Sequence, residues 1–453
     1  MYDGGVCIPN SARGVNKELM AIASPNTAST TTTAPTGQSY SIPLATVTTL
    51  FFMWGFLTCL NDILVPHLKS IFDLNYTRVM LIQFAFFGAY FIFSIPSAKI
   101  IDWIGYQRSM VLGLLTMGVG AFLFVPAASV PSYPLFLCAL IVLAAGITCL
   151  QVAANPYVTV LGKPETASSR LNLTQAFNSL GTFLAPFFGG LLILSAAPKT
   201  PAEIRAMPSA DALAYRLHEA ASVKMPYVGL GIALVLLAVA IGSFKLPKIE
   251  HAQHKVGEKV SDSIWKHPNL IFGAIAIFVY VGAEVSIGSF LVNYFAQPEI
   301  GGLTEKVAAS FVAFYWGGAM VGRFIGSALL QKVKTGGLLG ICAVCAAALV
   351  AISMLTSGHM AMYSIILVGF FNSIMFPSIF TLGVAELGPL TGDGSGIMIM
   401  AIVGGAFIPL AQGWIADHIG IHHAFFLPVI CYLYILFFAL SGSKPNSERY
   451  AKV

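Results

Sequence analysis

The sequence predicts an all-α membrane protein whose twelve transmembrane helices form two pseudo-symmetric six-helix bundles. Three observations support this fold class: the composition, the number of long apolar runs and an internal repeat. Of the 453 residues, 57% are hydrophobic and 9% are charged, whereas a soluble domain is about 25% charged. The chain therefore lacks the polar surface of a water-soluble protein. Its net charge of +5 is modest and does not predict nucleic-acid binding.

The first segment, residues 1–43, is predicted to be a disordered cytoplasmic tail. Its tract SPNTASTTTTAPTGQS is too polar and too rich in Ser, Thr and Pro to form a core. It contains no charged start followed by an apolar core and a cleavage site, so we expect the first apolar helix to act as the targeting signal. Met20 is an alternative start to Met1.

Twelve apolar runs follow, and each approaches or exceeds the roughly 20 residues that cross a bilayer as a helix. They lie at 44–68, 79–101, 108–128, 134–160, 170–195, 226–244, 269–296, 307–330, 338–356, 361–385, 396–416 and 423–441.

The longest polar interruptions between these runs, 196–225 and 245–268, suggest the domain organisation. We predict an N-terminal bundle at 44–244, a cytoplasmic linker at 245–268, a C-terminal bundle at 269–441 and a cytoplasmic tail at 442–453. With the N-terminus inside, fourteen Lys and Arg fall on the inner side and seven on the outer side. This asymmetry predicts that both termini are cytoplasmic.

Two Gly- and Pro-containing triplets recur at a nearly constant separation. Gly181, Pro186 and Gly190 recur 223 residues later as Gly404, Pro409 and Gly413. Pro156, Leu161 and Gly162 recur 221 residues later as Pro377, Leu382 and Gly383. Two such repeats at similar offsets indicate that the two halves arose by duplication. In transporters built from parallel six-helix repeats, the substrate site lies between the halves near mid-membrane.

Two acids lie inside apolar runs, Asp62 in the first and Glu284 in the seventh. An ionisable group in such a position costs about 3 kcal/mol or more, so it indicates a function. We predict that Asp62 and Glu284 form a coupling-ion site for a proton or sodium. The alternatives are that Asp62 lies near outside water beside Lys69, and that Glu284 is a hydrogen-bonded structural residue.

Amides are also frequent in the apolar runs, and each supplies donors and an acceptor, which suits the hydroxyls of a neutral sugar. The predicted substrate-binding residues are Asn61, Gln151, Asn155, Gln175, Asn178, Glu284, Asn293 and Asn372. Helix packing is the alternative role for each amide. Arg323 is interpreted as a residue near the inner end of its helix that orders a cytoplasmic loop.

Asp102, Gly105 and Arg108 form a charged, Gly-containing inner turn between the second and third runs, and are predicted to act as a conformational loop. We find no phosphate-binding loop, zinc-protease helix or hydrolase elbow, so neither direct ATP-driven pumping nor an enzyme is predicted. Seven cysteines show no ligand spacing, and His418, His422 and His423 are interpreted as a solvated cluster rather than a metal site. No metal and no cofactor are predicted.

The sequence resembles the fucose, galactose and glucose proton symporters of the major facilitator superfamily. The similarity is found in NDILVPHLK, CLQVAANPYVTVLG, RLNLTQAFNSLGTF and the glycines at 404 and 405, and it covers about residues 45–440. It implies that Asp62 takes part in proton coupling with Asn61 beside it, and that Gln175 and Asn178 bind sugar.

The resemblance is to the glucose/galactose branch of that family. Gln151 stands where fucose symporters carry a glutamate, and Glu284 stands where they carry Gln, so an acid is placed on a different helix. We therefore expect a monomeric hexose importer that works by cation symport and alternating access in the lipid bilayer of a bacterial inner membrane. The alternatives are a fucose:proton symporter, a multidrug efflux antiporter and a non-transporting sugar sensor.

Overall fold

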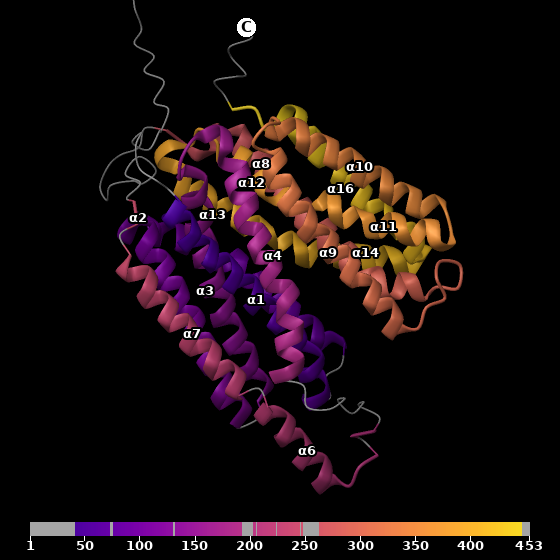
Figure 1. Cartoon of the computed structure of the whole chain (residues 1–453). Helices are drawn as coiled ribbons and strands as arrows, with labels where there is room; N and C mark the ends of the chain where they lie inside the picture. The colour runs from indigo at the N-terminus through magenta and orange to yellow at the C-terminus, as the bar shows by residue number, and fades with distance from the viewer. Residues whose placement is uncertain are drawn as a thin grey trace, which may run out of the picture. The chain divides into compact units, whose positions relative to one another are not determined.

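The computed structural model describes residues 41–72, 76–129, 132–192, 203–204, 206–222, 224–244, 246–247 and 262–445. At 58, 60–72, 76–81, 83, 186–192, 213, 216, 219–222 and 305–306 the description covers the backbone alone. Regular secondary structure in these ranges is entirely helical (Figure 1).

The N-terminal half contributes six long helices and one short 3-10 turn. They are α1 (Ser41–Phe72), α2 (Tyr76–Ser129), α3 (Tyr133–Val160), η1 (Pro164–Thr166), α4 (Ala167–Leu192), α6 (Ser209–Ser222) and α7 (Lys224–Ser243). Helix α6 lies in the first polar interruption, where the hydropathy pattern predicted no membrane crossing.

Helix α2 contains two predicted crossings joined at Gly105. This residue has φ 81° and ψ 167°, a backbone conformation that favours glycine because it has no Cβ. The spans predicted at 79–101 and 108–128 therefore reverse direction within one continuous run of helical residues.

The C-terminal half begins after a 3-10 turn, η3 (Ile264–Lys266). Its α-helices are α8 (Pro268–Ala296), α9 (Glu305–Leu329), α10 (Thr335–Leu355), α11 (Gly358–Asn372), α12 (Met375–Gly383), α13 (Thr391–Met400), α14 (Gly404–Ile419), α15 (Ile421–Ala424) and α16 (Phe426–Phe437). Short segments η4 (Gly388–Leu390), η5 (Ala401–Val403) and η6 (Phe438–Gly442) interrupt or extend them. Three crossings are therefore built from pairs of helices: α11 with α12, α13 with α14, and α15 with α16.

The number of crossings agrees with the twelve predicted from sequence. Nine runs among the described residues are long and apolar enough to span a membrane, and the run Phe84–Ser129 contains two crossings. Helices α1 and α4, whose side chains are only partly described, supply the remaining two. The all-α, twelve-helix fold class is confirmed.

The repeated glycines make equivalent helix contacts in the two halves. A Cβ atom on Gly181 of α4 would collide with the backbone oxygen of Phe52 on α1. A Cβ on Gly404 of α14 would collide with the backbone oxygen of Phe278 on α8. The second triplet diverges, because Gly162 has a positive φ of 106° whereas Gly383 does not.

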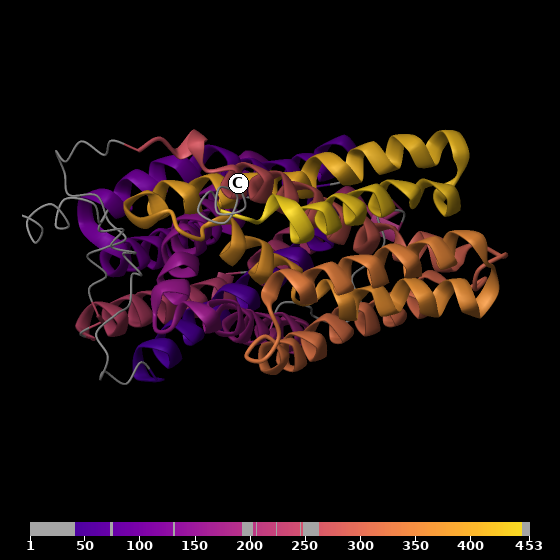
Figure 2. The same ribbon diagram turned by 90° about the horizontal axis from the view of Figure 1, so that it is seen from above.

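The two halves meet along α2 with α13, α3 with α13, α4 with α9 and α4 with α12. Lys99 Nζ of α2 lies 2.7 Å from Asp393 Oδ1 of α13, and Ser168 Oγ of α4 lies 2.6 Å from Thr381 Oγ1 of α12. Ser395 Oγ of α13 donates to the backbone oxygen of Val152 at 2.9 Å. Figure 2 shows the same helices from above.

Candidate functional site

Glu284 lies in the middle of α8, and Tyr280 lies one helical turn before it on the same face. The Tyr280 hydroxyl is 2.8 Å from Glu284 Oε1 and 3.1 Å from the backbone oxygen of Asn372, so its single proton has two acceptors. The side chain of Glu284 is 14% exposed. A carboxylate in this setting needs a fixed partner or a mobile cation.

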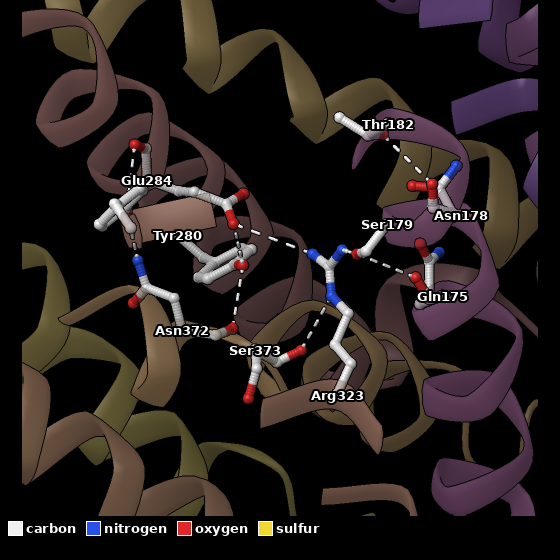
Figure 3. Close-up of polar contacts among 10 residues, drawn as sticks. Gln175, Asn178, Ser179, Thr182, Tyr280, Glu284, Arg323, Asn372 and Ser373 are labelled. Carbon is white, nitrogen blue, oxygen red and sulfur yellow. Dashed lines mark hydrogen bonds and ion pairs between the residues drawn. The ribbon is translucent and has the colours of Figure 1, made fainter. Parts of the chain in front are cut away.

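Arg323 of α9 supplies a fixed partner. Its Nη2 atom lies 4.0 Å from Glu284 Oε1, and its own side chain is also 14% exposed. Its Nε donates to the backbone oxygen of Ser373 at 3.3 Å, and its Nη1 donates to Ser179 Oγ on α4 (Figure 3). The interpretation of Arg323 as a residue that orders a cytoplasmic loop is therefore wrong, because the long side chain is directed toward α8 and α4.

A set of buried hydroxyl and amide groups surrounds this charge pair within the C-terminal half. Asn372 Nδ2 donates to the Tyr315 hydroxyl at 2.9 Å, and that hydroxyl lies 3.4 Å from the backbone oxygen of Glu284. Tyr315, Asn372 and Tyr432 are completely buried. These groups hold one another in part, because Asn372 Oδ1 and the Tyr432 hydroxyl have no partner among the described residues.

Several polar atoms of the predicted amides in the N-terminal half also have no partner among the described residues. Gln151 Nε2 donates to the Tyr90 hydroxyl at 2.8 Å, but its Oε1 is unpartnered. Asn155 is completely buried with both amide atoms unpartnered, and Gln175 Nε2 is unpartnered too. Buried polar groups are rarely left in this state, so these atoms indicate a place for water or a polar ligand.

Asn178 differs from Gln175, although both lie on α4. Its Nδ2 donates to the backbone oxygen of Phe51 at 2.9 Å, so one side of the amide joins α4 to α1. Thr182 makes a similar link, since its Oγ1 is 3.3 Å from the backbone oxygen of Gly55; it also lies 3.2 Å from the backbone oxygen of Asn178 (Figure 3). For the Asn178 Nδ2 group, the structure shows the packing contact that was the alternative to sugar binding.

One predicted residue lies apart from the rest, and two fall outside the described side chains. Asn293 is exposed on α8, nine residues after Glu284 and therefore about 13 Å further along the axis. Asn61 and Asp62 lie in α1, where their side chains are outside the described residues, so their predicted roles remain predictions.

The Asp102 turn lies next to the interface between the halves. Asp102 Oδ2 is 3.8 Å from Lys99 Nζ, and Lys99 pairs across the interface with Asp393. Arg108 is exposed, and Gln107 Nε2 instead donates to the backbone oxygens of Ile241 and Phe244 at the end of α7. Gln107 thus fastens α7 to the turn.

The sequence patterns did not single out Ser179, Ser373, Tyr280 or Tyr315 as site residues. Ser179 lies one turn after Gln175, which was the available signal for it. Among the described side chains, no group of three or more His, Cys, Asp or Glu is arranged to hold a metal ion.

The sequence pattern of the Major Facilitator Superfamily matches residues 44–402. A protein of Brucella abortus named "Glucose/galactose transporter" is 54% identical over 90% of this chain and 95% of its own length. The "L-fucose-proton symporter" of Escherichia coli is 37% identical over 90% of this chain and 94% of its own length.

A solved structure supports the same assignment. The crystal structure described as a Major Facilitator Superfamily transporter, FucP, in the outward conformation has a TM-score of 0.83 and 35% identity. The match covers 90% of this chain and all of that one. The resemblance predicted from the sequence is confirmed, and the chain belongs to the Major Facilitator Superfamily.

Proposed function

We propose that this protein imports a hexose, glucose or galactose, by cation symport. The observation that carries the proposal is the presence of buried amide atoms that have no partner among the described residues. The N-terminal half offers unpartnered amide atoms on Gln151, Asn155 and Gln175, while the C-terminal half pairs its own charges, Glu284 with Arg323. A site of this kind suits a neutral ligand rich in hydroxyl groups, because each amide both donates and accepts.

The relatives support the same substrate class, since one is named a glucose/galactose transporter and shares 54% of its residues with this chain. A relative at 37% identity is named an L-fucose-proton symporter. We therefore place the hexose between the halves, near the amides of α3 and α4, and propose that Asn61, Asn178 and Asn372 lie in the same region. Asn293 is left out of it, because it is exposed and lies about 13 Å further along α8 than Glu284.

Alternating access would proceed by breaking the contacts between the halves. Lys99 with Asp393, and Ser168 with Thr381, join the halves at the ends of their helices. The Asp102 turn is proposed to steady this closed arrangement. We further propose that this face is cytoplasmic, with both termini inside a bacterial inner membrane, and that the transporter works as a monomer.

A proton is the favoured coupling ion because a relative is named a proton symporter. The sequence predicts two candidate carriers, Asp62 and Glu284, and we propose Asp62 as the one that carries the proton. Moving one charge through 100 mV releases about 2.3 kcal/mol, which supports roughly fifty-fold accumulation of a neutral sugar. One proton for each hexose is sufficient.

The test is uptake of labelled D-glucose, D-galactose and L-fucose into proteoliposomes, with an imposed proton gradient, sodium gradient or neither. We expect glucose or galactose to accumulate with the proton gradient. Gln175→Ala should raise the KM about tenfold by removing a substrate hydrogen bond. The matched control is Gln331→Ala, which removes an exposed amide after α9.

Three outcomes would contradict the proposal. Efflux of apolar cations without hexose uptake would indicate a multidrug antiporter. Sugar binding without uptake would indicate a sensor, and accumulation of fucose in place of glucose and galactose would assign the chain to the fucose symporters.

A further inference from the structure

We propose that Arg323 is the permanent counter-ion of Glu284 and the releasable link between the halves, so that Glu284 does not carry the coupling ion. This inference rests on the proposed function and specifies how its site is divided. It leaves Asp62 as the coupling acid. The sequence suggested that Asp62 and Glu284 act alike, whereas the described contacts of Glu284 argue against that role for Glu284.

The charge pair of Glu284 and Arg323 lies entirely within the C-terminal half. Glu284 belongs to α8 and Arg323 to α9, and these two helices pack against each other. Rocking of two bundles moves them as units, so it leaves contacts inside a bundle intact. The 4.0 Å approach of Arg323 Nη2 to Glu284 Oε1 is therefore kept in both orientations.

Every described group that faces Glu284 also comes from the C-terminal half. These groups are Arg323 and the hydroxyl of Tyr280, with Tyr315 and Tyr432 as further electrostatic neighbours. Arg323 is the one cation among them, and it is present at all times. A carboxylate with a resident guanidinium has no need of a transported cation to balance it.

Arg323 and its neighbours on α9 also make contacts that cross between the halves. Arg323 Nη1 donates to Ser179 Oγ on α4, and Asn172 Nδ2 of α4 donates to the backbone oxygen of Arg323 at 2.7 Å. Ser169 Oγ donates to the backbone oxygen of Ser327 at 2.6 Å along the same seam. All the groups contributed by α4 are neutral, so separation of the halves leaves no charge without its partner. The guanidinium thus holds the halves together through a hydroxyl that it can release.

The main test compares Glu284→Gln, Arg323→Gln and the double variant E284Q/R323Q in proteoliposomes with equal amounts of inserted protein. Each single variant leaves one buried charge unpaired, so we expect its uptake to fall by about 100-fold or more. The double variant restores neutrality, and we expect it to recover at least about tenfold of that loss. It should also accumulate hexose when a proton gradient is imposed, whereas Asp62→Asn should not.

Two results would overturn the proposal. One is a double variant no better than either single variant. The other is a double variant that exchanges labelled hexose in counterflow but fails to accumulate it, because Glu284 would then be the ion carrier.

A second pair of variants tests the link to α4. Ser179→Asp gives Arg323 a charged partner across the interface, which should slow exchange at least about tenfold because a charged pair is harder to separate. Adding Arg323→Gln and Glu284→Gln to Ser179→Asp should remove the cross-interface ion pair and relieve this slowing. Slowing that persists in the triple variant would contradict the link.

Thermal unfolding of the purified variants separates this proposal from the proposed function. The loss of Tm in the double variant should be smaller than the sum of the losses in the two single variants. This holds whether or not the wild type transports hexose. Losses of Tm that simply add would show that Glu284 and Arg323 do not interact. A wild type without hexose uptake would contradict only the proposed substrate.

Discussion

In the N-terminal half α4 packs against α1 through Gly181 and Phe52, and in the C-terminal half α14 packs against α8 through Gly404 and Phe278. The packing is equivalent, but the polar groups are not. In the first half, amide atoms of Gln151, Asn155 and Gln175 have no partner among the side chains and backbone that the structure describes. In the second half, Glu284 is held by Tyr280 and Arg323.

This difference teaches that duplication preserved the backbone contacts of the fold while the two halves came to hold different chemistry. One half retains hydrogen-bonding capacity for a ligand. The other also contains polar atoms without a described partner, such as those of Gln412, but it pairs its intramembrane charges internally and supplies a charged link to its partner half.

The largest expected effect is a loss of stability when the glycine contacts that the two halves share are disrupted. Gly181→Ala and Gly404→Ala each place a Cβ against a backbone oxygen that cannot move aside as a side chain can. We expect each to lower the free energy of unfolding by about 3 kcal/mol, seen as a lower Tm and reduced folded yield. Gly229→Ala is the control, because a Cβ there meets nothing within 4 Å. A large loss in one half alone would contradict the equivalence.

Asp62 and Glu284 lie on the first helix of each half, and only Asp62 is expected to couple ion movement to transport. Asp62→Asn should abolish accumulation, removing a driving force of about 2.3 kcal/mol per 100 mV, while counterflow persists. The measurement is the steady-state ratio of internal to external labelled hexose under a proton gradient. Accumulation that survives this change would remove Asp62 from the coupling mechanism.

Replacing one buried asparagine in each half contrasts a free amide with a bonded one. Asn372→Leu breaks the bond to the Tyr315 hydroxyl and should cost about 1–3 kcal/mol of stability. Asn155→Leu removes two unpartnered atoms, so it should leave the Tm equal or higher while hexose KM rises. Equal loss of stability in both variants would show that Asn155 is a packing residue.

The smallest effect is expected at the ion pair between the halves. Lys99 is 51% exposed and its partner Asp393 is 23% exposed, so solvent screens their interaction. Lys99→Ala should change the free energy of the closed arrangement by less than about 1 kcal/mol, and added salt should reduce the difference in transport rate. A 100-fold change would make this pair the principal clamp.

The sequence by itself determined the twelve crossings and the repeat, because hydropathy and helix-breaking residues act over short stretches of chain. The glycines at 181 and 404 were recognisable for the same reason, as both are needed wherever two helices approach closely. The two intramembrane acids were also found locally, since any charge in an apolar run is costly.

Tertiary structure alone decided the partners of those residues. Gln175 and Asn178 look equivalent along α4, yet one keeps an unpartnered Nε2 and the other binds the backbone of α1. Arg323 was placed near the end of its helix by counting residues, but its long side chain reaches Glu284 and Ser179. Such contacts depend on the rotation and separation of helices that lie far apart in the chain, and no local pattern of residues specifies those quantities.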